Sequence, residues 1–448
     1  MISARSSARR YQFCQNFFVF GCSAHFLSRW EDWEICVGLL ILIFPIVLGC
    51  CRAWLTKLLV AFFVVQWIFK FPNTANHSNL GIFVGSIFLV AEFVRLKSGQ
   101  KSVETVEATV LSAIRALVIC VYFWATFHKL NTDFFNANVS SAVWYLDKLY
   151  GALTSQHLDE TLLGTIAPFA IWGTIIAEAS IFLCLLFSRF RWMGIAIGCC
   201  LHLFLSLGGF PDFSLIMTGL YFSFAPIDAF ENEQETNIAL SIMSMALVLA
   251  ATSRYWLEFR CGTTPELAEF VFGLVTLLTC SSICFLLFVR NKLATSLPAK
   301  NDCSVVVSVC FSIWCMFPYI GLSNQGNLTM FSNLITLSHR SNHLVVDTSK
   351  TKIFGFEEDY VEIAQIDPFG RFHHGQDITR SFIPLVSFSR SVELWKKHNS
   401  VPKNIVFIHK NETYTAKDLD QFLPKNAFAS KYLLFRMTPK EGPMKTCW

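Results

Sequence analysis

The chain has 448 residues, of which 53% are hydrophobic and 15% are charged, with a formal net charge of +4. In soluble domains about a quarter of the residues are charged, so the composition argues against a soluble globular protein. The sequence has no basic stripe with interleaved aromatic residues, which argues against a nucleic-acid partner. Most of the 16 cysteines lie in apolar runs and no Cys-x-x-Cys motif occurs, so we expect neither a disulfide framework nor a bound metal.

The first segment, residues 1–30, joins a basic, serine-rich stretch to a short apolar run. Met1 to Arg10 contains no acidic residue, and Phe17–Leu27 is short for a full span. Three interpretations of the apolar run stay open: a degenerate first span, an interfacial helix, or the core of a signal peptide.

Residues 31–322 contain one long apolar run after another. Since about 20 apolar residues in a helix cross a bilayer, we predict an all-α polytopic membrane bundle of about 9–11 transmembrane helices, in contact with membrane lipids. The predicted spans are Ile35–Cys51, Ala53–Phe69, Leu80–Leu96, Val110–Phe127, Leu162–Phe187, Met193–Leu207, Phe213–Phe224, Ile238–Thr252, Leu267–Val289 and Val305–Leu322.

Basic residues gather in alternate loops between these spans. They are Arg52 and the loops Arg95–Lys101, Arg189–Arg191 and Arg290–Lys300. Because cytoplasmic loops carry an excess of Lys and Arg, we assign this side to the cytoplasm and the C-terminal tail to the opposite side, which in a eukaryote is the lumen of the endoplasmic reticulum. The outer loops and the tail also hold four sequons, as in a glycoprotein: Asn76, Asn138, Asn327 and Asn411.

The tail, residues 323–448, contains no run long enough to span a membrane, and we predict a small extramembrane α+β domain there. The adjacent histidines His373 and His374 are interpreted as part of an exposed loop, because two neighbouring residues cannot complete a metal site. Short apolar or alternating runs predict strands at His343–Val346, Tyr360–Ile366, Ile405–Ile408 and Tyr432–Arg436, and helices at Val392–His398 and Ala416–Phe422.

Two basic residues mark the predicted outer ends of consecutive spans: His77 precedes one span and Lys129 ends the next. Sequential helices usually pack side by side, so we expect both residues at one depth beside a shared apolar cavity, with Phe123, Trp124 and Phe127 as aromatic walls that bind a flat ring. An amine is a base only when neutral, and a neutral histidine can donate to a developing oxyanion. Lys129 is therefore a candidate base and His77 its oxyanion partner. The alternative is that Lys129 flanks the span and extends to the headgroups.

Three further ionisable residues lie inside predicted spans and are candidate supporting residues. Arg115 lies about four turns before Lys129 on the same face, near the cytoplasmic interface, where its guanidinium is expected to reach the headgroups. Glu178 lies mid-span and could pair with Arg115 to fix the helix register without any chemistry. His202 also lies mid-span, where a histidine bonded within the core is the alternative to a role in the site.

The segment Val121-Tyr-Phe-Trp-Ala-Thr-Phe-His-Lys-Leu-Asn-Thr-Asp-Phe resembles the signature of the vitamin K-dependent gamma-carboxylase family, which shares a horizontally transferred transmembrane (HTTM) domain with other membrane proteins. Further motifs follow in the family's order: Asn76-His-Ser opening a span, Arg115 at the matching spacing, Glu178 before an apolar run, and Leu201-His-Leu followed by Gly209-Phe-Pro. The resemblance covers roughly residues 30–230. We therefore call residues 31–230 the carboxylase-like membrane domain and residues 231–322 the additional transmembrane helices.

This resemblance implies a lyase that acts on a reduced quinone such as reduced vitamin K. It places the family's base at Lys129 and the histidine that assists the chemistry at His77, and it implies an oxygen-driven epoxidation of the quinol that yields a strong base. The tail is shorter than the family's lumenal domain and shows no matching disulfide, so we do not expect a propeptide-tagged glutamate protein as the acceptor, which stays unknown.

Two functions from other classes remain open. The protein could bind a quinone or a lipid without catalysis, with its outer domain meeting a partner, or the membrane part could simply anchor the tail. The enzyme and the binding protein both require an apolar cavity reached by Lys129 and His77, whereas the anchor requires none. Only the enzyme requires a neutral Lys129.

Overall fold

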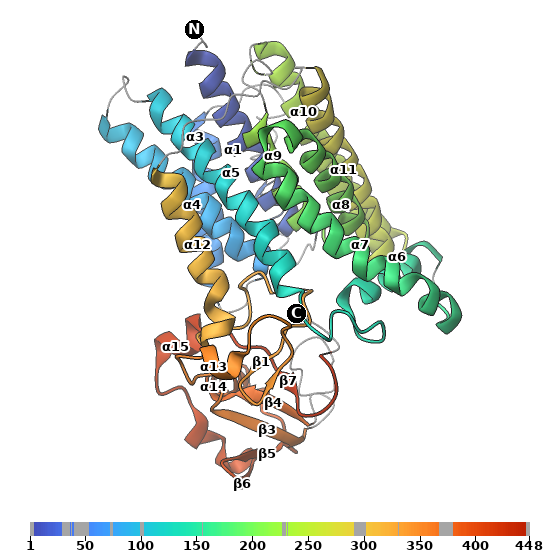
Figure 1. Ribbon diagram of the computed structural model, residues 1–448, viewed down its shortest axis with the longest axis vertical. Helices are drawn as coiled ribbons and strands as arrows, with labels where there is room; N and C mark the ends of the chain where they lie inside the picture. Colours follow the sequence, from blue (N-terminus) through green and yellow to red (C-terminus); the bar gives the residue numbers. More distant parts are fainter. Residues whose placement is uncertain are drawn as a thin grey trace.

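The computed structural model describes residues 4–28, 36, 38–39, 53–71, 75–98, 103–154, 156–225, 230, 232–290, 302–329, 331–366 and 380–444. A long helical body carries a smaller tail of strands and short helices at one end (Figure 1). Most of the predicted span Ile35–Cys51, and the pair His373 and His374, lie outside the described residues.

Eight helices of the body are long and apolar enough to cross a membrane, which is compatible with the multi-pass membrane protein that the sequence predicts. The total of 9–11 spans stays a prediction. The eight helices are α3 (Ala53–Lys70), α4 (Asn76–Ser98), α5 (Val103–His128), α7 (Glu160–Leu186), α8 (Arg191–Leu207), α10 (Glu233–Tyr255), α11 (Pro265–Arg290) and α12 (Asp302–Ile320); α1 (Ala4–Leu27), α6 (Ser141–Thr154) and α9 (Pro211–Tyr221) complete the described body.

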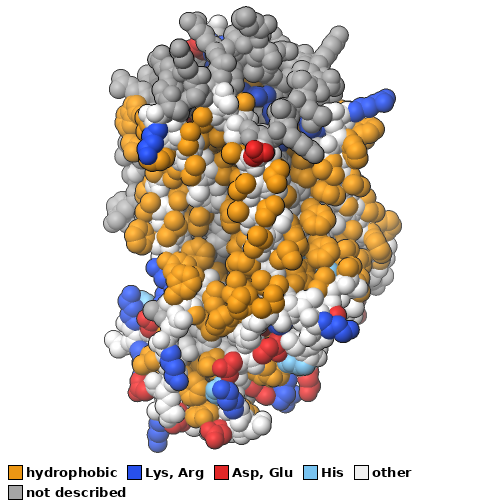
Figure 2. All heavy atoms as spheres, turned by 60° about the vertical axis from the view of Figure 1, so that its left-hand side comes forward, with side chains coloured by type: hydrophobic (Ala, Val, Ile, Leu, Met, Phe, Trp, Pro, Cys, Tyr) orange, Lys and Arg blue, Asp and Glu red, His pale blue; other side chains and the backbone are white. Residues whose placement is uncertain are grey.

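The outside of the body is apolar, as a lipid environment requires. On α7, Phe169, Trp172 and Ile176 are each more than half exposed, and hydrophobic side chains cover the helical body over the face seen in Figure 2, whereas charged side chains gather on the tail. A soluble protein rarely leaves so large an apolar surface uncovered. This surface supports the multi-pass interpretation.

The N-terminal segment forms a buried helix inside the bundle. Phe13, Phe17 and Phe18 of α1 are at most 1% exposed, and α1 packs along α9. The two helices approach closely because both carry glycine: a Cβ at Gly21 would clash with Ile216, and one at Gly219 would crowd the backbone of Phe17. The run Phe17–Leu27 is therefore buried among other helices of the body; whether it spans a membrane stays open.

The predicted span Phe213–Phe224 is also an interior element. Its helix α9 has 11 residues, begins with Pro211 at its first position, and continues into a short 3₁₀ turn, Phe222–Phe224. All residues of α9 except Phe213 are buried. The apolar run is therefore explained by contact with other helices on all sides, and its length does not need to match a bilayer.

The tail folds around a five-stranded antiparallel sheet with strand order β6-β5-β3-β4-β7. The helix α14 (Leu385–Lys397) packs on the sheet, where Phe388 contacts Phe407 and the core residue Val361 lies beneath. The strands are β1 (Thr336–Leu337), β2 (Arg340–Ser341), β3 (Tyr360–Gln365), β4 (Ser381–Pro384), β5 (Val406–His409), β6 (Glu412–Thr415) and β7 (Thr438–Pro439), and the other helices are α13 (Thr348–Thr351), the 3₁₀ helix Ala416–Phe422 and α15 (Ala427–Tyr432).

The structure confirms two of the four predicted tail strands, at β3 and β5, and corrects the other two. The segment His343–Val346 pairs with the body: Leu344 N donates to Leu130 O at 2.8 Å, and the side chain of His343 accepts from Val345 N and Val346 N, which turns the chain. The segment Tyr432–Arg436 bonds instead to the connecting loop, because Leu434 O accepts from Asn324 N and Gln325 N.

Buried asparagines fasten the tail to the body. The side chain of Asn333 accepts from Ser141 N and Oγ at 2.9 and 2.7 Å, and donates to Val139 O and Met444 O at 2.9 and 2.7 Å. Asn131 donates to His128 O at 2.9 Å and to Ser332 O. The tail therefore lies against the loop that follows α5, as the predicted sidedness requires; which side of a membrane this is stays a prediction.

The four sequons differ in accessibility. Asn138 and Asn411 are exposed, whereas Asn76 and Asn327 are 6% and 1% exposed, and Asn327 Nδ2 donates to Trp314 O at 2.9 Å. A glycan needs a surface asparagine. In the folded protein only the first two sites meet that requirement.

We predict that Asn333→Asp weakens the contact between tail and body. A carboxylate keeps the shape of the side chain and tolerates the positive φ of 54°, but it cannot donate to Val139 O and Met444 O. Each buried group left without its partner costs about 1–3 kcal/mol. Thermal unfolding in detergent should show a lower midpoint for Asn333→Asp, and no change for Asn237→Asp, which alters an exposed asparagine of α10.

We also predict that acid loosens this contact through His343. Burial lowers the pKa of His343 below its ordinary value of 6.5, although the bond from Nε2 to Phe127 O, at 2.9 Å, acts in the opposite direction. Below about pH 6.5 the unfolded tail binds a proton that the folded tail refuses, so the free energy of unfolding falls as the pH falls.

The measurement is the unfolding midpoint of the wild type and of His343→Asn at a series of pH values above and below 6.5. The asparagine can keep a local acceptor but does not titrate in this range. As the pH falls below 6.5, the unfolding midpoint of the wild type should fall more than that of His343→Asn. A difference that stays constant with pH would contradict the prediction.

Candidate functional site

A buried lysine–glutamate pair lies at the tail end of the body. Lys129 follows the last residue of α5, and its Nζ donates to Glu178 Oε1 of α7 at 2.9 Å and to Ala125 O at 3.4 Å. The side chains of Lys129 and Glu178 are only 7% and 10% exposed. The ammonium of Lys129 therefore does not extend to the headgroups, and a carboxylate from another helix neutralises it.

The sequence of α7 explains why Glu178 faces inward. The buried residues of this helix recur every three or four positions, which is one face of an α-helix, and Glu178 occupies a position in that stripe. The stripe consists of Ala167, Ile171, Ile175, Glu178, Ile181 and Leu185. Burying an unpaired carboxylate in this face would cost free energy. The ion pair with Lys129 offsets that cost.

Arg115 does not pair with Glu178. Its Nε donates to Ser223 O at 2.5 Å and its guanidinium lies 6.0 Å from the ring centre of Phe224. Arg115 is 8% exposed, so it is packed inside the body. The prediction from the sequence, that its guanidinium reaches the headgroups, is therefore wrong. Its partner is a backbone carbonyl after α9, which the sequence alone does not bring near.

His202 belongs to a second buried polar group. Its Nε2 lies 2.5 Å from the hydroxyl of Tyr122, which also contacts the hydroxyl of Tyr221. All three side chains are at most 3% exposed. The absence of a side chain at Gly198 makes room for the Tyr221 hydroxyl, since a Cβ there would clash with it. The group joins α5, α8 and α9.

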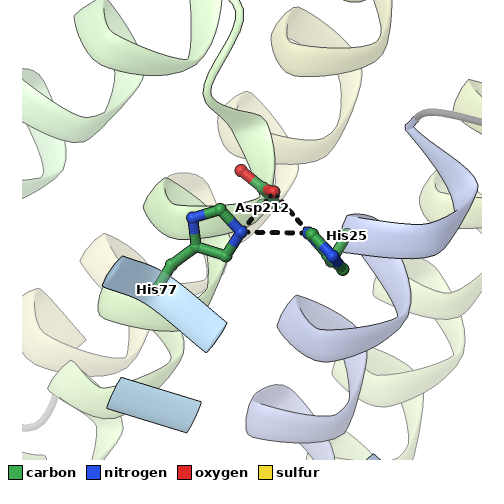
Figure 3. A group of neighbouring side chains, drawn as sticks. All are labelled: His25, His77 and Asp212. Atoms are coloured by element: carbon green, nitrogen blue, oxygen red, sulfur yellow. Dashed lines mark hydrogen bonds and ion pairs between the residues drawn. The ribbon is translucent and has the colours of Figure 1, made fainter. Parts of the chain in front are cut away.

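His77 lies in a third group, with His25 of α1 and Asp212 of α9 (Figure 3). Asp212 Oδ2 is 2.9 Å from His25 Nδ1 and 3.0 Å from His77 Nε2, and the two ring nitrogens are 3.0 Å apart. His77 and Asp212 are 1% and 2% exposed, and the side chain of His25 is 11% exposed. These three groups could hold a metal ion.

Of these three residues, His77 is predicted as a site residue from the sequence, whereas His25 and Asp212 are not. The available signal was their place at helix ends: His25 is in the last turn of α1, His77 in the first turn of α4, and Asp212 follows Pro211 at the start of α9. No sequence spacing connects the three positions, so only the packing of the helices brings them together.

Lys129 and His77 have separate partners. Among the residues that the structure describes, neither a hydrogen bond nor an ion pair joins them. The shared apolar cavity therefore stays a prediction. Lys129 contacts Glu178, and His77 contacts Asp212.

The three predicted aromatic residues, Phe123, Trp124 and Phe127, pack on one another, with ring centres 5.3–5.9 Å apart. That they bind a flat ring stays a prediction. Phe123 is 40% exposed and packs against Phe127 and against Phe182 of α7, which lies one turn after Glu178. Trp124 turns to α12, where its Nε1 donates to Ser312 Oγ at 3.1 Å. Phe127 contacts the ring of His343 in the tail, and only Phe123 reaches the helix that carries Glu178.

No protein-family model, curated protein or solved structure matches the chain. A function has to be argued from the residues and their geometry.

We predict that Tyr122→Phe destabilises the body more than Tyr221→Phe does. Removing the Tyr122 hydroxyl takes a partner from both His202 and Tyr221, at about 1–3 kcal/mol for each group left unpaired. Removing the Tyr221 hydroxyl breaks one contact and leaves the 2.5 Å bond to His202 in place. Thermal unfolding in detergent compares the two variants, and equal shifts would show that Tyr122 is not the centre of the group.

Proposed function

We propose that this protein is a multi-pass membrane enzyme in which Lys129 and Glu178 together remove a proton from a lipid-soluble acid, such as a reduced quinone. The observation that carries the proposal is a lysine and a carboxylate, each about nine-tenths buried, in contact at 2.9 Å at the end of an apolar helix bundle. Buried ionisable groups in membrane helices are costly and usually functional.

The pair offers a balanced route for the proton. Lys129 passes one proton along the existing hydrogen bond to Glu178, and the amine, now neutral, takes a proton from the quinol hydroxyl. The products are a neutral Glu178, a lysine ammonium and a quinolate beside it. One ion pair replaces another, so no charge is left alone in a medium of low dielectric constant.

The resemblance to the vitamin K-dependent carboxylases supports the same residue as the base and suggests the quinol as its substrate. It adds His77 as the group that assists the chemistry. Phe123 is a predicted aromatic residue that contacts the helix of Glu178, through the ring of Phe182. We place the tail outside the cytoplasm, since the lysine- and arginine-rich loops are assigned to the other end of the body. The protein acceptor of a carboxylation, if one exists, is not part of this proposal.

We predict that Lys129→Ala abolishes the consumption of reduced vitamin K under oxygen by the purified protein, because no amine remains to take the proton. General base catalysis contributes about 10²–10⁴-fold to a rate, so the loss should be at least 100-fold. Lys129→Arg should not restore the rate, since arginine stays protonated. Glu178→Gln should lower it as well, because an amide cannot accept the first proton.

The matched control is Lys57→Ala. Lys57 and Glu92 also form an ion pair between consecutive helices, at 2.6 Å, but toward the end of α4 that lies away from the tail. This variant should retain the wild-type rate. A Lys129→Arg protein with full activity would refute a role for Lys129 as a base.

The second candidate function is quinone or lipid binding without catalysis. It is favoured by the contact between Lys129 and Glu178, because each of the two buried groups already has a partner without any substrate. Mass spectrometry of molecules that co-purify in detergent separates the candidates: a bound quinone with turnover supports the enzyme, and a bound quinone without turnover supports the binding protein. A protein with neither acts as an anchor for the tail.

A further inference from the structure

The histidine–aspartate group is built from three helix ends that converge from distant parts of the chain. His25 comes from the end of α1, His77 from the start of α4 and Asp212 from the start of α9, and their rings and carboxylate point toward one another (Figure 3). A helix N-terminus favours a carboxylate, and Asp212 Oδ1 also accepts from Phe213 N at 2.7 Å. The backbone thus fixes this carboxylate in place.

When Asp212 is ionised, hydrogen bonds alone do not satisfy the group. If both ring nitrogens carry a hydrogen and donate to Asp212 Oδ2, the two N–H groups oppose each other across 3.0 Å. If one nitrogen carries none, its lone pair opposes the ionised carboxylate oxygen at 2.9–3.0 Å. One of the three contacts is unfavourable in either case, whereas a cation between them would attract three lone pairs at once.

The distances are also compatible with a particular coordination geometry. Two donor atoms at right angles around a metal about 2.1 Å away are about 3.0 Å apart, whereas donors in a tetrahedron are about 3.4 Å apart. The observed separations are 2.9, 3.0 and 3.0 Å, so the three atoms match one face of an octahedron. Two histidines and one carboxylate on such a face leave three positions open.

We infer that His25, His77 and Asp212 bind one divalent first-row transition-metal ion in six-coordinate geometry. Imidazole and carboxylate together suit Fe²⁺, Mn²⁺ and Co²⁺, and the lack of thiolate argues against a structural zinc site. The other ring nitrogen of His77, Nδ1, is buried and has no hydrogen-bond partner among the described residues. The position of this ring therefore depends on what its Nε2 contacts, which is the metal in the occupied site.

No metal is expected from the sequence, because it contains no Cys-x-x-Cys motif and its one adjacent histidine pair cannot complete a site. These three ligands are far apart in the sequence and meet only through the packing of α1, α4 and α9. The inference does not depend on the proposed base, since Lys129 has no bond to this group among the described residues.

The test is a titration with Co²⁺ of the full chain in detergent, purified without a polyhistidine tag and treated with a chelator. We expect one Co²⁺ per chain, with the weak d–d absorption of six-coordinate cobalt. Asp212→Asn and His25→Gln should each lower the affinity at least about 100-fold, because changes even to groups behind the ligands cost about 10–100-fold. The control His157→Gln alters an exposed histidine, whose side chain is 90% accessible, and should bind like the wild type.

Failure to bind Co²⁺ by the folded wild type would overturn the inference, as would binding that survives both ligand substitutions. An intense four-coordinate spectrum would overturn the octahedral assignment. Size-exclusion chromatography identifies a variant that does not fold. If a variant fails to fold, the titration of the wild type alone still decides whether the protein binds Co²⁺. Lys129→Ala should still bind Co²⁺, so the metal site and the proposed base fail or succeed separately.

Discussion

The need to give buried charged groups a polar partner inside an apolar bundle is the constraint on which this structure depends. Lys129 and Glu178 meet at 2.9 Å because neither could be buried alone, and this contact fixes α5 against α7. Tyr122 and His202 join α5 to α8 in the same way. Apolar contacts between membrane helices allow many registers, whereas these polar contacts allow very few.

The same constraint gives the bundle two different ends. At the tail end, the helix termini that hold Lys129 and His77 are covered by the asparagine-rich contact with the tail, where Asn79 donates to Gly326 O at 3.2 Å. Buried backbone groups outside helices need such partners. Asn131 and Asn333 supply several for the loop after α5, so the end that holds the candidate sites is also the end that is sealed by side-chain hydrogen bonds.

The sequence predicted the multi-pass helical architecture and picked out Lys129, Glu178 and His202, because an ionisable residue stands out in an apolar run. It could not predict their partners: Arg115 was only one possible partner of Glu178, and the pairing of Glu178 with Lys129 depends on how α5 and α7 are rotated. His25 and Asp212 were missed because polar residues at helix ends are common. In the tail, the strand signal of His343–Val346 was outweighed by pairing with residues of the body, which local pattern cannot reveal.

The burial of α1 bears on the order in which the protein is made. This helix is synthesised before the other helices of the described body. It carries Gln15 and Asn16, both at most 1% exposed, and Asn16 accepts from Thr56 Oγ1 at 2.6 Å. The helix that covers its other face, α9, begins only at Pro211. Until the ribosome has delivered that part of the chain, α1 has polar side chains and no complete set of neighbours. The complete set of contacts that buries α1 can therefore form only after α9 has been made.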